Sequence, residues 1–172
     1  EARRYYFSIV AKYGMQVQML LNKISTLDVK MICPLHGPVL KENLEYYINK
    51  YDLWSKYEPE EDGILIVYTS IYGNTEKAAK KMAEILKEID VNKIVIRNLV
   101  EQDIDETVAE SFKYSKIILA APSYNANVFP PMAVFLNKLK ERNFQKRKIG
   151  LIENGSWAPS AAKSMKEIIS KM

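Results

Sequence analysis

The chain has 172 residues, of which 48% are hydrophobic and 27% charged, and its formal net charge is +4. This composition is that of a globular protein, and the length allows one domain or one domain with part of a second. The mild basic excess is not gathered into a patch with interleaved aromatic residues, which disfavours nucleic acid as a partner. No apolar run approaches a membrane-spanning length. The single cysteine excludes an internal disulfide and favours a reducing, cytoplasmic compartment.

The N-terminal part of the chain predicts two helical stretches with a short strand between them. Apolar residues recur at helical spacing over residues 2–24 and again from Leu44 to Trp54. Between them, Val29–Cys33 predicts a short strand in which Cys33 is a buried core thiol. An acidic segment with proline and glycine, residues 56–63, has the composition of a linker. We therefore expect one domain over residues 1–62 and a second over 63–172.

From residue 63 onward, strands and helices alternate. Apolar runs at Ile64–Tyr68, Lys93–Asn98, Lys116–Ala121 and Lys148–Glu153 predict four strands, and a segment with helical spacing follows each of them. This βαβαβαβα order predicts an α/β fold with a parallel, doubly wound sheet. In such a sheet, ligands bind beyond the carboxyl ends of the strands, where the strand order switches.

The turn after the first predicted strand carries the strongest functional signal, Thr69-Ser70-Ile71-Tyr72-Gly73-Asn74-Thr75. A strand, a small polar turn and a helix together present backbone N–H groups to a phosphate. The turn has neither the lysine of a Walker A loop nor the GxGxxG pattern of a dinucleotide site. A single phosphate monoester therefore fits best, and the alternative is an ordinary polar connection that binds nothing.

Two further strand ends are polar and unusual. Residues 122–131 follow the third predicted strand and residues 154–159 follow the fourth. Tyr124 and Trp157 in these loops could stack on a flat ring, while Asn125 and Asn154 could bond its polar edges. Either aromatic residue alone is more often a loop anchor. Together with the phosphate turn, the three loops have the layout that flavin mononucleotide (FMN) needs.

These segments resemble a known family. The turn at residues 69–75, Ala121-Pro122-Ser123-Tyr124-Asn125 and Asn154-Gly155-Ser156-Trp157 are similar to the three FMN loops of the flavodoxin domain in flavodiiron proteins. Arg3-Arg4-Tyr5-Tyr6-Phe7 and the segment Ile32–Pro38 resemble the end of that family's metallo-β-lactamase-like domain. The resemblance covers almost the whole chain.

The resemblance implies a flavodoxin-like sheet in strand order 2-1-3-4, with the family's fifth strand apparently missing. It implies FMN passing electrons to a diiron centre that reduces dioxygen or nitric oxide, in a head-to-tail homodimer supplied by a donor such as a rubredoxin or its reductase. His36 would be the last iron ligand. The residues that the resemblance places around FMN are Thr69, Ser70, Ile71, Tyr72, Gly73, Asn74, Thr75, Pro122, Ser123, Tyr124, Asn125, Asn127, Asn154, Gly155, Ser156 and Trp157.

His36 is also the point at which the chain departs from the family. It is the only histidine, and one imidazole cannot hold two irons. We expect a diiron centre only in a longer parent protein. Taken alone, His36 is better explained as a loop histidine hydrogen-bonded to the backbone. The loss of the fifth strand would leave the fourth strand as an exposed edge.

Three functions compete. The first is an electron-transfer module, in which the flavin does the redox chemistry and this chain supplies no catalytic side chain. The second is a stand-alone flavodoxin-like protein or an NAD(P)H-dependent FMN or quinone reductase, which would need a nicotinamide site beside the flavin. The third is a receiver-like signalling domain, which would need aspartates that are absent from the ends of the first and third strands. The basic cluster Lys146-Arg147-Lys148, with Arg142, predicts a solvated loop or, alternatively, a docking surface for an acidic partner.

Overall fold

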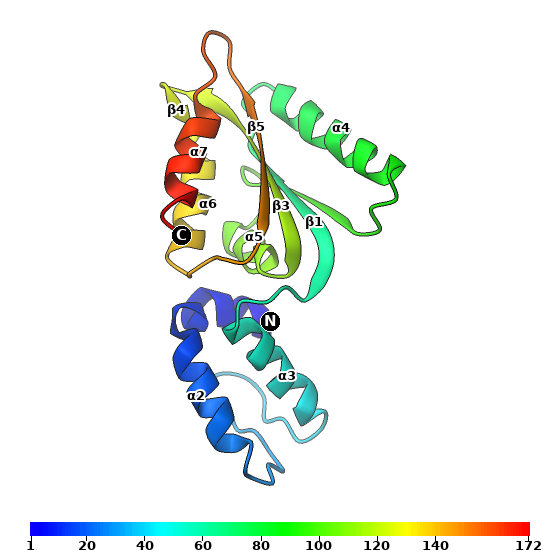
Figure 1. The fold of residues 1–172 in the computed structure, drawn as a ribbon, viewed down its shortest axis with the longest axis vertical. Helices are drawn as coiled ribbons and strands as arrows, with labels where there is room; N and C mark the ends of the chain where they lie inside the picture. Colours follow the sequence, from blue (N-terminus) through cyan, green and yellow to red (C-terminus); the bar gives the residue numbers. More distant parts are fainter.

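The computed structural model describes residues 1–172 as a helical N-terminal region beside an open sheet with helices on both faces (Figure 1). The N-terminal region confirms the two predicted helical stretches. The first is continuous through α1 (Ala2–Tyr5), the π-helix η1 (Tyr6–Val10), the 3₁₀-helix η2 (Ala11–Tyr13) and α2 (Gly14–Ile24). The second is α3 (Leu44–Ser55). None of the helices is long and apolar enough to cross a membrane.

The strand predicted at Val29–Cys33 is wrong. This segment forms a single antiparallel bridge, in which Ile32 and Leu40 exchange two backbone hydrogen bonds of 2.9 Å. Cys33 is exposed and free, not a buried core thiol. One bridge has no neighbouring strands to build a sheet and no second layer to cover its apolar face. The periodicity of the sequence could not show that absence.

The sheet contains β1 (Glu61–Tyr68), β2 (Ile94–Asn98), β3 (Tyr114–Tyr124), β4 (Asn127–Val128) and β5 (Lys148–Asn154). Four strands are parallel in the spatial order β2-β1-β3-β5, which confirms the predicted order 2-1-3-4. The fifth strand is β4, which pairs antiparallel with the end of β3 and was not predicted from the sequence. β5 pairs only with β3, so its other edge is open, as expected.

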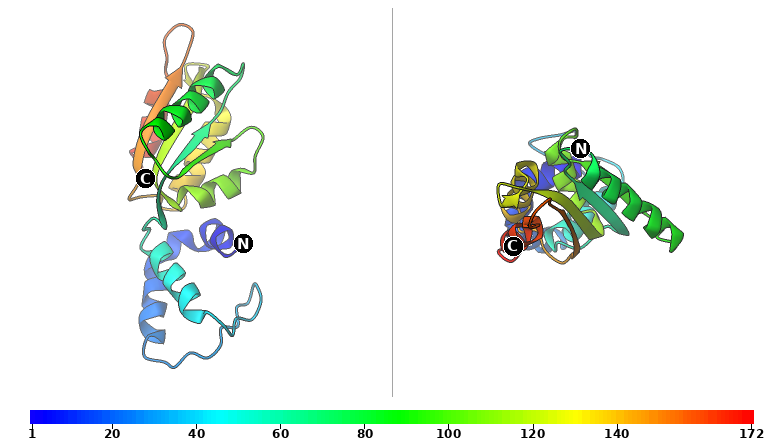
Figure 2. Two further views of the ribbon diagram at one scale, coloured as in Figure 1. Left: turned by 90° about the vertical axis from the view of Figure 1, so that its right-hand side faces the viewer. Right: turned by 90° about the horizontal axis from the view of Figure 1, so that it is seen from above.

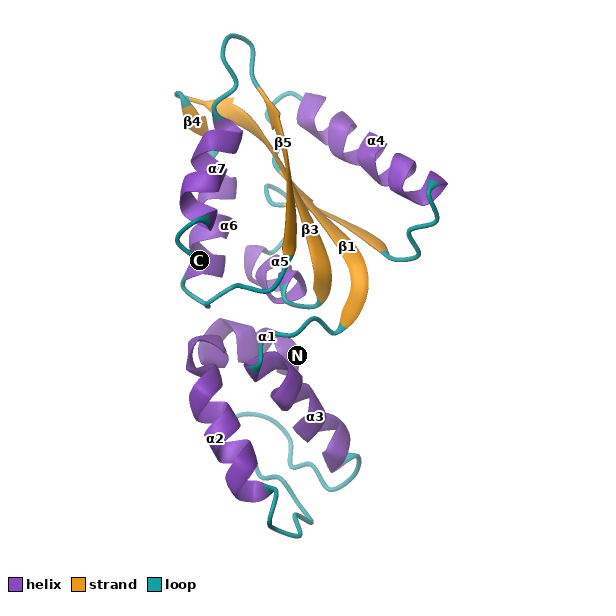
Figure 3. Ribbon diagram, in the orientation of Figure 1, coloured by secondary structure: helices purple, strands orange, loops and turns teal.

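Helices cover the two faces of the sheet unequally (Figure 3). The helix α4 (Asn74–Glu88) covers one face, where Ala79 and Ala83 pack on Ile64 and Ile66. The other face carries α5 (Ile104–Ser111), α6 (Pro130–Lys140) and α7 (Ala161–Ile169) over the larger core. Consecutive residues of β1 are buried on alternate faces, which explains its unbroken apolar sequence.

The N-terminal region packs against the sheet at the amino ends of its strands (Figure 2). The rings of Phe7 and Phe112 stack with centroids 4.0 Å apart, and Tyr6 and Trp54 belong to the same apolar core. Because β1 begins at Glu61, the last two residues of the predicted 1–62 domain lie in the sheet. The division into two domains remains a prediction.

A buried carboxylate reinforces this junction. The Glu60 side chain is 1% exposed and accepts hydrogen bonds from Arg3 (2.5 and 2.9 Å), Lys50 (2.6 Å) and the indole N–H of Trp54 (2.8 Å). Burial alone would raise the Glu60 pKa, but the hydrogen bonds from Arg3, Lys50 and Trp54 outweigh it and lower that pKa to about 2. The charged group therefore ties α1 and α3 to the start of β1.

Candidate functional site

The three predicted loops lie together at the carboxyl end of the sheet. They follow β1, β3 and β5, which are adjacent and parallel: Tyr68 is in register with Ala120, and Pro122 with Asn154. Figure 1 shows the three loops at the upper end of the sheet, away from the N-terminal region. This juxtaposition was expected from the strand order, because parallel neighbouring strands end at the same edge.

The first loop has the features of a phosphate site. Gly73 has φ +79° at the N-cap of α4, and no side chain caps the first N–H groups of that helix. The hydroxyls of Thr69 and Ser70 are buried and have no hydrogen-bond partner. Unpaired buried donors are costly and rare, and a helix N-terminus favours an anion. Together these groups offer hydroxyl and amide donors to a phosphate, with no basic side chain among them.

The first turn of α4 also contains a carboxylate, Glu76, whose charge is neutralised by a lysine. Glu76 forms an ion pair of 2.5 Å with Lys80, one turn further along the helix. The hydrogen bond from Lys80 lowers the Glu76 pKa, so the pair carries no net charge near neutral pH. Thr75, the neighbour of Glu76, is 2% exposed.

The second loop is a hairpin that presents an aromatic ring. Tyr124 and Asn127 are paired across a two-residue turn, whose residues Asn125 and Ala126 have φ of +49° and +56°. Tyr124 is 46% exposed, and its ring lies 5.6 Å from that of Phe129. The Asn127 side-chain oxygen accepts the N–H of Val128 at 2.8 Å, so this predicted FMN residue also shapes the turn.

The third loop is anchored to the second by a serine. The Ser123 hydroxyl oxygen accepts the backbone N–H groups of Ser160 (2.8 Å) and Ala161 (3.2 Å), the first donors of α7. Gly155 lies against the same group, because a Cβ there would be 3.1 Å from the Ser123 oxygen. Ser123 therefore orders the loop that carries Trp157, whose side chain is 99% exposed.

Sequence reasoning missed one polar group beside these loops. The Ser160 hydroxyl is buried and has no hydrogen-bond partner. A serine directly before a helical run is a familiar N-cap signal, and it could have drawn attention to Ser160. Here the capping is done by Ser123 from another loop and by Glu153, which accepts the N–H of Ala162 at 2.9 Å. The Ser160 hydroxyl is left free.

The residues at this end of the sheet fit FMN. The first loop supplies unpaired hydroxyls and free helix N–H groups for a phosphate, while Tyr72 (87% exposed), Tyr124 and Trp157 supply exposed ring faces. The remaining predicted residues lie on the same loops: Pro122 is buried, Gly73, Ser123 and Gly155 are half-buried, and Ile71, Asn74, Asn125, Asn154 and Ser156 are exposed.

His36 belongs to the N-terminal region and lies on none of the three loops. It lies in the exposed loop between α2 and α3, where its ring centroid is 5.8 Å from that of Tyr5. No backbone hydrogen bond to His36 is present, contrary to the expectation from its sequence alone. No three His, Cys, Asp or Glu side chains of the chain are grouped so that they could hold a metal ion.

Comparison with known proteins identifies the family. A model of the flavodoxin domain matches residues 65–171, which is more than half of the chain. The chain belongs to the flavodoxin domain family. This membership implies FMN as the cofactor of the domain. The matched residues include all three loops, whereas residues 1–62 lie outside the match.

Relatives with longer chains extend the likeness beyond the flavodoxin domain. An uncharacterized protein of Methanocaldococcus jannaschii is 28% identical over 179 residues, covering 100% of this chain and 44% of the relative. The anaerobic nitric oxide reductase flavorubredoxin of Vibrio vulnificus is 27% identical over 157 residues, covering 90% of this chain and 32% of the relative. The flavodoxin-domain chain thus spans less than half the length of these relatives.

Two solved structures share its fold. The flavodiiron protein from Giardia intestinalis aligns with a TM-score of 0.90 at 20% identity, covering 97% of this chain and 41% of its own. The rubredoxin oxygen:oxidoreductase from Desulfovibrio gigas aligns with a TM-score of 0.88 at 22% identity, covering 98% and 42%. Because these alignments include most of residues 1–62, the fold of the N-terminal region is shared as well.

Proposed function

We propose that the flavodoxin-like region of this chain binds FMN at the three loops and acts as an electron-transfer module. The observation that carries the proposal is the set of unpaired polar groups at one end of the sheet. The Thr69 and Ser70 hydroxyls and the uncapped start of α4 adjoin loops with exposed aromatic rings. A fold that leaves buried donors unpaired at a ligand edge gains their hydrogen bonds only when a ligand binds.

Each loop has its own task in this proposal. The hydroxyls of Thr69, Ser70 and Thr75 and the first N–H groups of α4 hold the phosphate, while Tyr124 and Trp157 flank the ring. Bound FMN supplies the redox chemistry, and the protein tunes it through stacking and hydrogen bonds. No side chain has to act as an acid, base or nucleophile. Ser123 keeps the third loop in position through its bonds to Ser160 and Ala161.

The wider role concerns a longer protein than this chain. Relatives and structures with the same fold include a nitric oxide reductase flavorubredoxin and a rubredoxin oxygen:oxidoreductase. We propose that this chain serves a flavodiiron-type reductase of dioxygen or nitric oxide, in which residues 1–62 are the end of a metallo-β-lactamase-like domain. His36 would then be one iron ligand, with the other ligands outside this chain. A rubredoxin-type donor, a head-to-tail homodimer and a cytoplasmic location belong to the same proposal.

The alternative of an NAD(P)H-dependent reductase gains no support from the arrangement of charges. A nicotinamide nucleotide would need a cationic site beside the flavin loops. A pocket rich in cations, which contains Lys116, Arg147 and Lys148, lies at the opposite end of the sheet.

Replacing Thr75 with valine tests the phosphate site. Valine keeps the shape and removes one hydroxyl, so FMN binding should weaken by about 1–3 kcal/mol, the range for hydrogen bonds to charged groups. Fluorescence titration of FMN measures the change. Thr26→Val is a matched control, because the Thr26 hydroxyl donates to the Lys23 carbonyl in an exposed loop. An unchanged affinity for Thr75→Val would remove the phosphate from this turn, and a chain that stays colourless with excess FMN would refute the whole proposal.

A further inference from the structure

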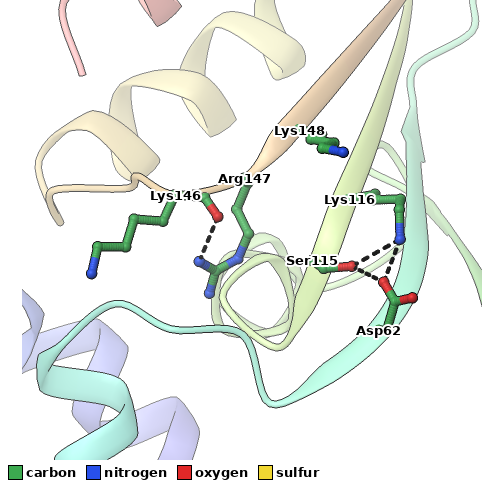
Figure 4. Close-up of a pocket in the computed structure, with 6 residues that line it drawn as sticks. All are labelled: Asp62, Ser115, Lys116, Lys146, Arg147 and Lys148. Carbon is green, nitrogen blue, oxygen red and sulfur yellow. Dashed lines mark hydrogen bonds and ion pairs between the residues drawn. The ribbon is translucent and has the colours of Figure 1, made fainter.

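A second polar pocket lies at the amino end of the sheet, away from the flavin loops. It has a volume of about 430 Å³ and contains no hydrophobic side chain. Figure 4 shows the six residues that line it, which come from the starts of β1, β3 and β5 and the loop before β5: Asp62, Ser115, Lys116, Lys146, Arg147 and Lys148. Four of these side chains are cations and one is a carboxylate.

Two of the lysines are direct neighbours on adjacent strands. Lys116 and Lys148 are register partners on the adjacent parallel strands β3 and β5. Like charges directly opposite one another destabilise a sheet. Lys116 is compensated, because its ammonium group contacts the Asp62 carboxylate, which also accepts the Ser115 hydroxyl at 2.5 Å. The Asp62 carboxylate also attracts Lys148, but Lys148 forms no ion pair of its own, so one carboxylate faces two ammonium groups.

Arg147 adds a third charge to the wall of the pocket. Its terminal nitrogens donate to the carbonyl oxygens of Tyr57 (2.6 Å) and Phe112 (2.5 Å), and its Nε–H is buried without a partner. These acceptors are neutral, and the carboxylates of Glu58 and Glu60 attract the Arg147 charge without forming an ion pair with it. Burial lowers the Arg147 pKa to about 10, which still leaves the group charged at neutral pH. Arg147 was predicted to lie in a solvated loop, but its hydrogen bonds to Tyr57 and Phe112 fix its side chain in place.

Lys146 takes no part in this excess of charge. Its ammonium group pairs with Glu58 at 2.6 Å, and Figure 4 shows its side chain pointing away from the other five residues. The cation of the pocket without an ion pair or a set of fixed acceptors is therefore Lys148, next to a Lys116 whose single carboxylate partner is exposed. A fold that keeps such a cluster tolerates a local electrostatic cost. An anion in the pocket would remove it.

We propose that this pocket binds a multivalent oxyanion of the phosphate class, held by the ammonium groups of Lys116 and Lys148. The site is distinct from the flavin phosphate turn, since Lys116 is in register with Ile64, five residues before Thr69, or about 16 Å at 3.3 Å per residue. A small ligand fits better than a protein surface, because a specific protein interface needs roughly 800 Å² on each partner.

Calorimetric titration of pyrophosphate into the 172-residue chain, at constant ionic strength, tests the proposal. A saturable site that depends on Lys148 is expected. Lys148→Met should weaken its binding at least about tenfold, as the loss of a hydrogen bond to a charged group implies. Lys163→Met is the matched control, because Lys163 is an exposed lysine of α7 at a distance from the pocket. Thr75→Val should also leave this affinity unchanged.

A charge reversal provides the second variant. Lys148→Glu should abolish pyrophosphate binding and, by forming a cross-strand pair with Lys116, should raise the thermal stability of the ligand-free chain. Binding that is not saturable, or that survives Lys148→Met and Lys148→Glu in folded protein, would overturn the proposal. So would a site lost in Thr75→Val and kept in Lys148→Met, because the anion would then occupy the flavin phosphate turn.

Discussion

The two ends of the sheet use polar residues in opposite ways. At the carboxyl end, the loops carry hydroxyls and amides, and the buried hydroxyls of Thr69, Ser70 and Ser160 have no partner. At the amino end, charged groups dominate and most are paired, as in the bonds of Glu60 to Arg3 and Lys50. Paired groups at one end fasten the N-terminal region to the sheet. Unpaired groups at the other end are available to a ligand.

This difference separates stability from binding. A buried ion pair whose partners are all in the chain is strongly destabilising when one partner is removed. A buried hydroxyl without a partner lowers the stability of the folded state and gains a hydrogen bond only when a ligand binds. Removing a paired group at the amino end should therefore change unfolding, and removing an unpaired hydroxyl at the carboxyl end should change FMN binding.

The largest expected effect is at Glu60. Glu60→Ala leaves Arg3, Lys50 and the Trp54 N–H without their shared acceptor, and should lower the free energy of unfolding by about 3–5 kcal/mol. Denaturant unfolding measures this loss. Glu58→Ala is the control, because its pair with Lys146 is about half exposed and is worth about 1 kcal/mol or less. Equal losses in the two variants would contradict the assignment of Glu60 as the principal tie.

The same carboxylate predicts a pH dependence. The Glu60 pKa is about 2 in the folded chain, below its ordinary value of 4.5, so its ionised form stabilises the fold above pH 4.5. That contribution should be lost as the pH falls from 4.5 toward 2. The difference in free energy of unfolding between the native chain and Glu60→Gln should shrink over this window. A difference that is constant from pH 6 to pH 2 would show that the Glu60 charge plays no part.

At the carboxyl end, Ser70→Ala should weaken FMN binding without lowering the stability of the FMN-free chain. FMN binding should weaken by about 1–3 kcal/mol, because the phosphate loses a hydroxyl donor. The FMN-free chain should be unchanged or slightly more stable, because a buried unpaired hydroxyl has been removed. FMN titration and thermal unfolding without FMN measure the two effects. A loss of stability without FMN would mean that the Ser70 hydroxyl has a partner within the fold.

The smallest effect is expected at Ser123, which both stabilises the fold and positions a loop of the flavin site. Ser123→Ala removes the acceptor for the first N–H groups of α7 and should cost about 0.5–2 kcal/mol of stability, as for other lost helix caps. FMN affinity should fall as well, because the loop with Trp157 is no longer held. Ser164→Ala is a control in the same helix, since the Ser164 hydroxyl only bonds the Ser160 carbonyl. If FMN affinity is unchanged, Ser123 only caps the helix.

Local patterns were sufficient for the helices, the four parallel strands and the position of the flavin loops, but not for the segment Val29–Cys33 or for β4. The continuous apolar runs of β1 and β3, the helical spacing and the single glycine of the 69–75 turn are all short-range features. Once the strand order is 2-1-3-4, the carboxyl ends of β1, β3 and β5 must be adjacent. The two-residue strand β4 was missed because its turn uses Asn125 and Ala126, and alanine at positive φ gives no sequence signal.

The amino-acid sequence by itself thus determined the parallel strands and the three loops, because these depend on periodicity and on the polarity of strand ends, while the strand order came from the resemblance to flavodiiron proteins. Only the tertiary structure decided which polar groups are paired. Glu60 is buried among three donors, Ser123 caps a distant helix, and Lys148 faces Lys116 without a carboxylate of its own. Each of these facts depends on residues far apart in the chain, since a hydrogen bond or ion pair exists only where folding brings both partners together.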